Sequence, residues 1–210
     1  MYYLGLDLGQ AQDYTALVVV ERIGTGEDLM SHLRHIYRYP LRTPYPEIVD
    51  SVLDKMKKPP LKGKTALVVD ATGVGAAVID MFSERGLAPV QVKIHGGDKM
   101  TRDGQECRVP KRDLASAVQY YLQNRLLKIS DRLKMADVLL REMMAFRVKI
   151  SASGHDSYEA WREGDHDDLV IALAMVCWYM LEGGYGTEEE YDYSRNTEEW
   201  PPVGHETWKL

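Results

Sequence analysis

Cysteine is scarce in this chain of 210 residues, which contains only Cys107 and Cys177. Two cysteines cannot form the disulfide framework of a small secreted domain, so we expect a reducing cytoplasm as its location. Long apolar runs are also missing, since the longest uncharged one, residues 169–181, is shorter than the roughly 20 residues that cross a bilayer. We expect a buried helix there. The opening MYYLG has no basic segment, which argues against a secretory signal peptide.

Neither sign of charge is in large excess, because 26 Lys and Arg face 32 Asp and Glu for a net charge of −6. Most of the difference lies in residues 183–210, which hold seven acidic and two basic side chains. We expect one domain over residues 1–184, followed by an acidic, flexible tail at 185–210. The rest of the chain is nearly neutral, so local basic segments can still bind a polyanion such as a nucleic acid.

Apolar and β-branched runs predict three consecutive strands at 2–7, 15–22 and 33–39. No helix is predicted between them, which indicates an antiparallel meander. Helix and strand patterns then alternate, and strands separated by helices pair in parallel. The elements expected in this part are a helix at 46–57, a strand at 65–69, a helix at 76–85 and a strand at 89–94. The sequence thus predicts an α/β fold with a mixed sheet flanked by helices.

Residues 95–109 are rich in glycine and charge and are predicted to form a loop. Further helices are expected from Pro110 onward, at 132–146 and at 167–181, with extended stretches at 126–129 and 147–151. In the helix after Pro110, the positions expected to face inward are Leu114, Ala117, Val118, Tyr121 and Leu122. The aromatic residues expected in the core, rather than stacked on bases, are Tyr120, Tyr121 and Trp178.

Aspartates stand at three places where folding does not require an acid. Asp7 ends the first strand, Asp70 follows the strand at 65–69, and Asp167 and Asp168 open the last helix. Each alone has an ordinary explanation, because aspartate starts turns and caps helices. The neighbouring His166 is likewise explained as a surface or capping residue. If the first and fourth strands are parallel neighbours, however, Asp7 and Asp70 leave the same sheet edge, where open α/β sheets place their sites.

Clustered carboxylates repel one another unless a cation lies between them. Mg²⁺ and similar ions prefer oxygen ligands and bridge phosphate oxygens. Two such ions about 3.5–4 Å apart can orient a water and stabilise the leaving oxygen in phosphodiester hydrolysis. The positive end of a helix also favours an ionised acid at 167 or 168, and spacing alone does not separate these two. The pattern therefore points to a two-metal hydrolase site.

Four segments carry a resemblance to the nuclease domain of bacteriophage terminase large subunits: GLDLGQAQDYTALVVVE, VVDATGVGAAVIDMF, VPKRDLASAVQYYLQNRLLKI and EGDHDDLVIALAMVCW. The resemblance covers residues 2–182. It implies a ribonuclease-H-like fold and an endonuclease that uses Mg²⁺ or Mn²⁺, with two ions expected, to cut concatemeric double-stranded phage DNA during packaging in a bacterial host. It also implies a motor ATPase, portal or small terminase subunit as partner, and no membrane.

On the matching positions, the resemblance assigns catalysis to Asp7, Asp70 and Asp168 and metal binding to the same acids together with Asp167. Asp168 matches the acid of the last helix, and Asp167 is then an auxiliary ligand. Asp13 matches a second, auxiliary acid of the first hairpin. These roles predict metal-dependent hydrolysis with little sequence preference.

Basic residues at 95–112 are candidates for holding DNA phosphates without reading sequence. They are Lys99, Arg102, Arg108, Lys111 and Arg112. The competing interpretation is a solvated surface loop. Lys111 and Arg112 are expected in the first turn of a helix, where the dipole disfavours cations, and this small cost favours a functional role for them.

The ATPase motor of full terminase large subunits is not recognisable here. Gly63-Lys64-Thr65 resembles the end of a P-loop, but Lys58 stands where the first glycine belongs, so we expect the motor elsewhere. GLDLGQAQD and DATGVG also resemble the phosphate loops of actin-like or sugar-kinase-like ATPases, and tight ATP binding would favour such an enzyme. The sequence is also compatible with a Holliday-junction resolvase, which would cut only branched DNA, and with a catalytically inactive packaging scaffold.

Overall fold

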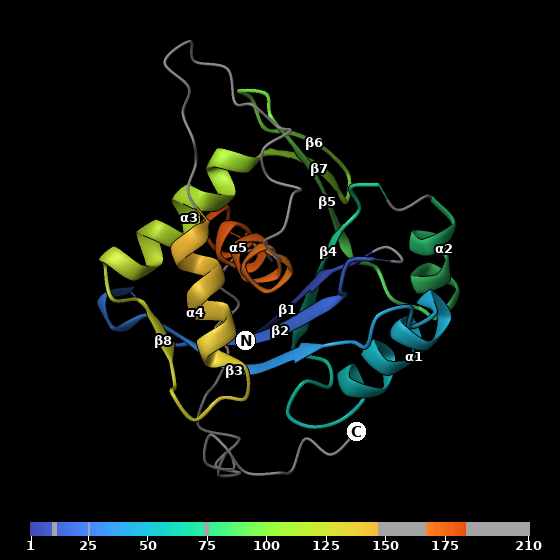
Figure 1. Cartoon of the computed structure of the whole chain (residues 1–210), viewed down its shortest axis with the longest axis horizontal. Coiled ribbons are helices and arrows are strands. Elements are labelled where there is room, and N and C mark those ends of the chain that lie inside the picture. The colour runs from blue at the N-terminus through green and yellow to red at the C-terminus, as the bar shows by residue number, and fades with distance from the viewer. Residues whose placement is uncertain (10–11, 25, 74–75, 147–166, 184–210) are drawn as a thin grey trace.

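The computed structural model describes residues 1–9, 12–24, 26–73, 76–146 and 167–183 (Figure 1). Its strands are β1 (Tyr2–Asp7), β2 (Ala16–Ile23), β3 (Met30–Arg38), β4 (Thr65–Asp70), β5 (Val90–His95), β6 (Thr101–Asp103), β7 (Glu106–Pro110) and β8 (Leu127–Ile129). Its α-helices are α1 (Tyr45–Met56), α2 (Ala76–Glu84), α3 (Lys111–Gln123), α4 (Ala136–Ala145) and α5 (Asp168–Leu181). The predicted strand at 147–151, His166 and the acidic tail at 185–210 lie outside the described residues.

The strands of the described residues form one sheet in the order β6-β7-β5-β4-β1-β2-β3-β8. β1, β2 and β3 pair antiparallel, which confirms the predicted meander. β1 pairs in parallel with β4, β4 with β5 and β5 with β7. The prediction of a mixed sheet flanked by helices is therefore confirmed, and the predicted neighbours β1 and β4 lie side by side.

Helices cover both faces of the sheet. Successive side chains of each strand point to opposite faces, so they enter two different cores. In β1, Tyr3 enters the core formed with α3, α4 and α5, whereas Leu4 and Leu6 enter the core formed with α1 and α2. Figure 1 shows these two groups of helices on opposite sides of the strands. Apolar burial on both faces explains why β1, β2 and β4 read as nearly continuous apolar runs.

Helix α5 is the most deeply buried helix described, with every residue from Asp168 to Met180 buried. This confirms the buried helix predicted from the apolar run, and among the described residues no helix is long and apolar enough to cross a membrane. The helix lies directly on β1 at Gly5, where an added Cβ would stand 2.2 Å from the carbonyl oxygen of Ala172. Glycine at position 5 thus permits the close approach that brings the start of α5 to the end of β1.

Three predictions for residues 95–123 are wrong. The loop expected at 95–109 contains the antiparallel hairpin of β6 and β7, whose inward alternation at Cys107 and Val109 is masked in sequence by glycines and charges. In α3, Leu122 and Tyr120 are 42% and 46% exposed, because only a narrow stripe of that helix faces the core. Tyr121 and Trp178 are buried, as predicted.

Candidate metal centre

The carboxyl ends of β1 and β4 bring two of the predicted acids to one edge of the sheet. The strands run in parallel, and Leu6 pairs with Val69, so the next residue in each strand is Asp7 and Asp70. The side chain of Asp70 is oriented by its own turn, because its Oδ1 accepts a hydrogen bond from the backbone N–H of Thr72 at 2.7 Å. The expected meeting of these acids at the sheet edge is therefore observed.

Burial and mutual repulsion make these two carboxylates costly to ionise. Burial raises the pKa of Asp7 well above its ordinary value, and the charges of Asp70, Asp168, Asp167 and Asp13 raise it further. Burial also raises the pKa of Asp70 to about 6, against the hydrogen bonds from Thr72 and the nearby charge of Lys111. The charges of the other four acids therefore act on Asp7.

The start of α5 supplies the other two acids, and each is paired with a cationic side chain. Asp167 precedes the helix as its N-cap residue, and its Oδ2 lies 3.4 Å from Nζ of Lys111. Asp168 is buried, and its two carboxylate oxygens accept hydrogen bonds from Nε and Nη2 of Arg38 at 2.7 and 3.0 Å. The two neighbouring acids therefore have different environments, which sequence spacing could not show.

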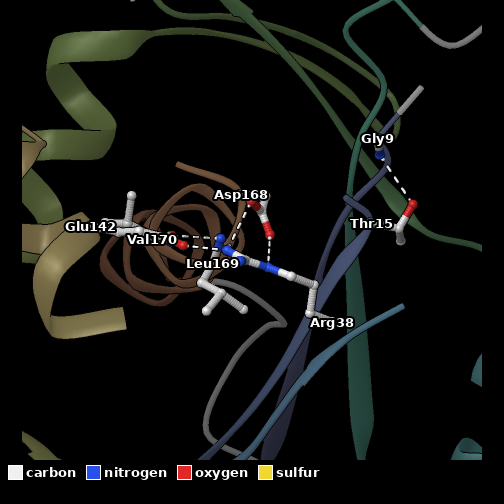
Figure 2. Close-up of polar contacts among 7 residues, drawn as sticks. All are labelled: Gly9, Thr15, Arg38, Glu142, Asp168, Leu169 and Val170. Carbon is white, nitrogen blue, oxygen red and sulfur yellow. Dashed lines mark hydrogen bonds and ion pairs between the residues drawn. The ribbon is translucent and has the colours of Figure 1, made fainter. Parts of the chain in front are cut away.

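Arg38 and Glu142 also belong to this site, although neither was predicted from the sequence. Nη2 of Arg38 also donates to Oε1 of Glu142 on α4, while Oε2 of Glu142 accepts the backbone N–H groups of Leu169 and Val170 at 2.9 and 3.0 Å (Figure 2). Burial and the charge of Asp168 raise the pKa of Glu142 to about 7, against Arg38 and the Val170 N–H. The sequence did contain one signal. Arg38 ends β3, which is the second strand from β1 in the sheet, and Asp7 ends β1.

The turn between β1 and β2 borders the site and carries Asp13. Oγ1 of Thr15 accepts a hydrogen bond from the backbone N–H of Gly9 at 3.1 Å, which ties the end of β1 to the start of β2 (Figure 2). Asp13 is exposed and has the smallest of the four acidic effects on the pKa of Asp7. It lines a hollow of about 320 Å³ together with Arg42 and Tyr45. Asp13 thus lies at the rim of the site.

The predicted DNA-binding residues divide into two groups. Lys111 belongs to the acid cluster, where burial lowers the pKa of its ammonium group against the attraction of Asp167, Asp7 and Asp70. Lys99, Arg102 and Arg108 are exposed on or beside the β6–β7 hairpin, and Arg112 is bound to Asp98 at 2.6 Å. Arg102 pairs across the hairpin with Cys107, the neighbour of Arg108 in the chain, so these two arginines leave opposite faces. The five residues do not form one continuous patch.

The donor set is suited to a hard divalent cation, because it consists of carboxylate oxygens only. As the side chains stand, the described part of the chain contains no group of three His, Cys, Asp or Glu residues that could hold a metal ion. Asp167 and Asp168 instead make the contacts with Lys111 and Arg38 described above. Binding an ion between the strand acids and α5 therefore requires rotation of side chains.

Neither a protein-family model nor a curated protein matches the chain. Among solved structures, the large terminase of bacteriophage HK97 is similar, with a TM-score of 0.50 and 15% identity over 84% of this chain and 39% of that one. The human cytomegalovirus terminase nuclease domain has a TM-score of 0.49 and 17% identity, covering 85% of this chain and 82% of that one. RuvC of Thermus thermophilus has a TM-score of 0.43 and 19% identity over 89% and 98%.

Proposed function

We propose that this chain, whose ribonuclease-H-like fold is similar to that of the HK97 large terminase, is a metal-dependent endonuclease that cuts double-stranded DNA. The observation that supports the proposal best is the position of Asp7 and Asp70 at the ends of adjacent parallel strands, where the charges of the acids that open α5 act on Asp7. The proposed substrate is concatemeric phage DNA during packaging. The proposed partners are a motor ATPase, a portal or a small terminase subunit.

In this proposal Asp7, Asp70 and Asp168 are the catalytic acids, and Asp167 is an auxiliary ligand. Two Mg²⁺ or Mn²⁺ ions, when bound, would orient the attacking water and stabilise the departing 3′ oxygen. Lys111, the first residue of α3, lies beside Asp167 and supplies a positive charge close to the acids. That charge favours the approach of a DNA phosphate to a region that the carboxylates would otherwise make strongly negative.

The electrostatics of the acid cluster support cation binding. Burial and four acidic neighbours oppose the ionisation of Asp7, and burial opposes that of Asp70. A divalent cation would reverse this balance, because an opposite charge within a few ångströms favours the ionised form of a carboxyl group. Cation binding should therefore release protons from the cluster at pH values near 6, the pKa of Asp70, a coupling that is general for sites whose ligands bind as anions.

The proposal is tested by plasmid digestion with Mn²⁺, with Mg²⁺ and with EDTA. We expect the divalent ions to support conversion of supercoiled plasmid to nicked and linear forms, and EDTA to abolish it, because the acids cannot hold the ions in its presence. A linear duplex and a four-way junction are digested in parallel. Cutting of the junction alone would favour a resolvase, and absence of cutting with either metal would contradict a nuclease.

The exposed cations of the hairpin are expected to hold DNA phosphates. Replacing Lys99, Arg102 and Arg108 together by alanine should weaken binding to any duplex sequence and reduce the slope of log affinity against log salt by about 1 for each of these cations that holds a phosphate. The matched control replaces the exposed Lys57, Lys58 and Lys62, near the end of α1, with the same loss of charge. Fluorescence anisotropy with labelled duplexes measures both. An equal loss of affinity in the control would contradict a specific role for the hairpin.

A further inference from the structure

Arg38 lies at the same edge of the sheet as the acid cluster. Asp7 pairs with Ala16 across β1 and β2, and Ala16 pairs with Arg38 across β2 and β3, so the three residues form one cross-strand row. The guanidinium carbon of Arg38 lies 4.8 Å from the centroid of the Tyr14 ring. The row explains how a residue of β3 reaches the start of α5, and the ring restricts the plane of the guanidinium group.

Two acids from different helices bind the guanidinium group. Arg38 donates to both carboxylate oxygens of Asp168 through Nε and Nη2, and Nη2 also donates to Glu142. The side chains of Arg38, Glu142 and Asp168 are only 12%, 6% and 8% exposed. Paired hydrogen bonds from a buried, planar guanidinium fix the rotation of a carboxylate more strictly than a single point charge can.

Glu142 also fixes the backbone of the helix that carries Asp168. Its Oε2 accepts the N–H groups of Leu169 and Val170, two of the orphan donors at the helix start. The same carboxylate therefore contacts both the first turn of α5 and the arginine that orients Asp168. Figure 2 shows this arrangement, with Arg38 reaching from β3 toward Asp168 and Glu142.

We propose that Arg38 is a positioning residue that sets the rotation of the Asp168 carboxylate, and that Glu142 in turn orients Arg38. The inference rests on the proposed nuclease function, because it assigns a role within the same site. Each oxygen of Asp168 uses one lone pair for Arg38, which leaves a lone pair for a cation. In this proposal Arg38 stays bound to Asp168 when an ion binds, and the rotation that ion binding requires takes place in the other acids. Arg38 therefore acts through Asp168 rather than on the DNA.

Kinetics at saturating Mn²⁺ distinguish positioning from charge. R38M and R38K should both lower kcat by a factor on the order of 10–100, because lysine restores the charge but not the paired hydrogen bonds. Recovery of the wild-type rate by R38K would overturn the inference, because a charge alone would then suffice.

The matched control is R34M, which removes another ion pair of β3. Arg34 contacts Glu21 at 2.8 Å, and both side chains are nearly as buried as the Arg38 pair, at 13% and 15% exposure. We expect R34M to lower thermal stability but to change kcat by less than about twofold.

The variant E142Q tests whether Glu142 orients Arg38. Glutamine keeps one oxygen that can accept the α5 amides, but it replaces the oxygen that accepts from Arg38 by an NH₂ group. Its kcat should fall about tenfold, whereas a wild-type rate would reduce Glu142 to a helix cap.

Nuclear magnetic resonance tests the inference without relying on activity. In nitrogen–proton spectra, the Nε–H signal of Arg38 should be protected from solvent exchange in the metal-free protein and remain so after saturation with Mg²⁺. D168A should abolish the protection. Loss of the protection on adding Mg²⁺ would overturn the inference. If the wild type cuts no DNA but the signal behaves as expected, the proposed function fails and the pairing of Arg38 with Asp168 stands; if the wild type cuts and R38M cuts equally fast, only the inference fails.

Discussion

Replacing Asp70 by asparagine is expected to abolish DNA cutting and to stabilise the metal-free fold. Cutting should fall by about 10³-fold or more, because the amide is a poor ligand for the ions that the site needs. Asparagine keeps an Oδ1 that can accept the Thr72 N–H, so the local turn is preserved. The pKa of Asp70 is raised from 3.8 to about 6, which corresponds to about 3 kcal/mol of folding free energy lost on ionisation.

The gain in stability should depend on pH in a defined direction. The folded protein favours protonated Asp70, so the wild type loses stability as pH rises from about 4, the unfolded pKa, to about 6, the folded pKa. Above that range the difference between D70N and wild type is complete, at about 6–12 °C in melting temperature. Below about pH 4 it should vanish, because both states then carry a neutral side chain at this position.

Thermal unfolding of both proteins at pH 3 and pH 8, in buffer containing EDTA, measures this difference. The control is D80N, which makes the same change of charge at an exposed position of α2 and should alter neither cutting nor melting. Added Mg²⁺ should raise the melting temperature of the wild type more than that of D70N. A ligand that binds the folded state stabilises that state, and D70N binds the ion more weakly. A D70N protein that cuts plasmid at the wild-type rate would remove Asp70 from the site.

Replacing Gly5 by alanine is expected to destabilise the fold by about 3 kcal/mol, or about 6–12 °C in melting temperature. The added Cβ would stand 2.2 Å from the Ala172 carbonyl oxygen and 2.8 Å from Cγ2 of Val176. A backbone atom cannot rotate away, so α5 must move from β1 as a unit. Because Asp168 lies four residues before Ala172, and Asp7 two residues after Gly5, the same movement should also reduce DNA cutting below the melting temperature.

The control for this variant is G97A, in a bend after β5. There the added Cβ would meet only the side chain of His95, and we expect a change in stability below about 0.5 kcal/mol. Chemical denaturation and circular dichroism measure both variants. An unchanged melting temperature for G5A would mean that α5 does not depend on the close approach at this position. Normal cutting by a destabilised but folded G5A would separate helix placement from the geometry of the acids.

The strand acids could be found from sequence because their signal is local. Asp7 and Asp70 each follow a short apolar run, and alternation of helix with strand predicts the parallel pairing that joins them. The buried helix that supplies Asp167 and Asp168 was equally visible as an apolar run. The β6–β7 hairpin was missed because glycine and charge outweigh the apolar alternation of Cys107 and Val109.

The roles of charged side chains in the site depended on long-range packing. Arg38 and Glu142 are separated by 104 residues, and Arg38 and Asp168 by 130, so no periodicity in the sequence links them. Likewise, nothing near Lys111 in the sequence indicates that its ammonium group contacts Asp167 and is not exposed like the cations of the β6–β7 hairpin.

The amino-acid sequence by itself determined the mixed α/β architecture, the deep burial of α5 and the edge at which the strand acids gather, because hydrophobic periodicity and strand connection act over short stretches of chain. Only the tertiary structure decided which cation each acid faces and how closely α5 approaches β1. Those features arise where elements distant in sequence come within hydrogen-bonding distance, and a buried ion pair depends on that geometry more than on the identity of its residues.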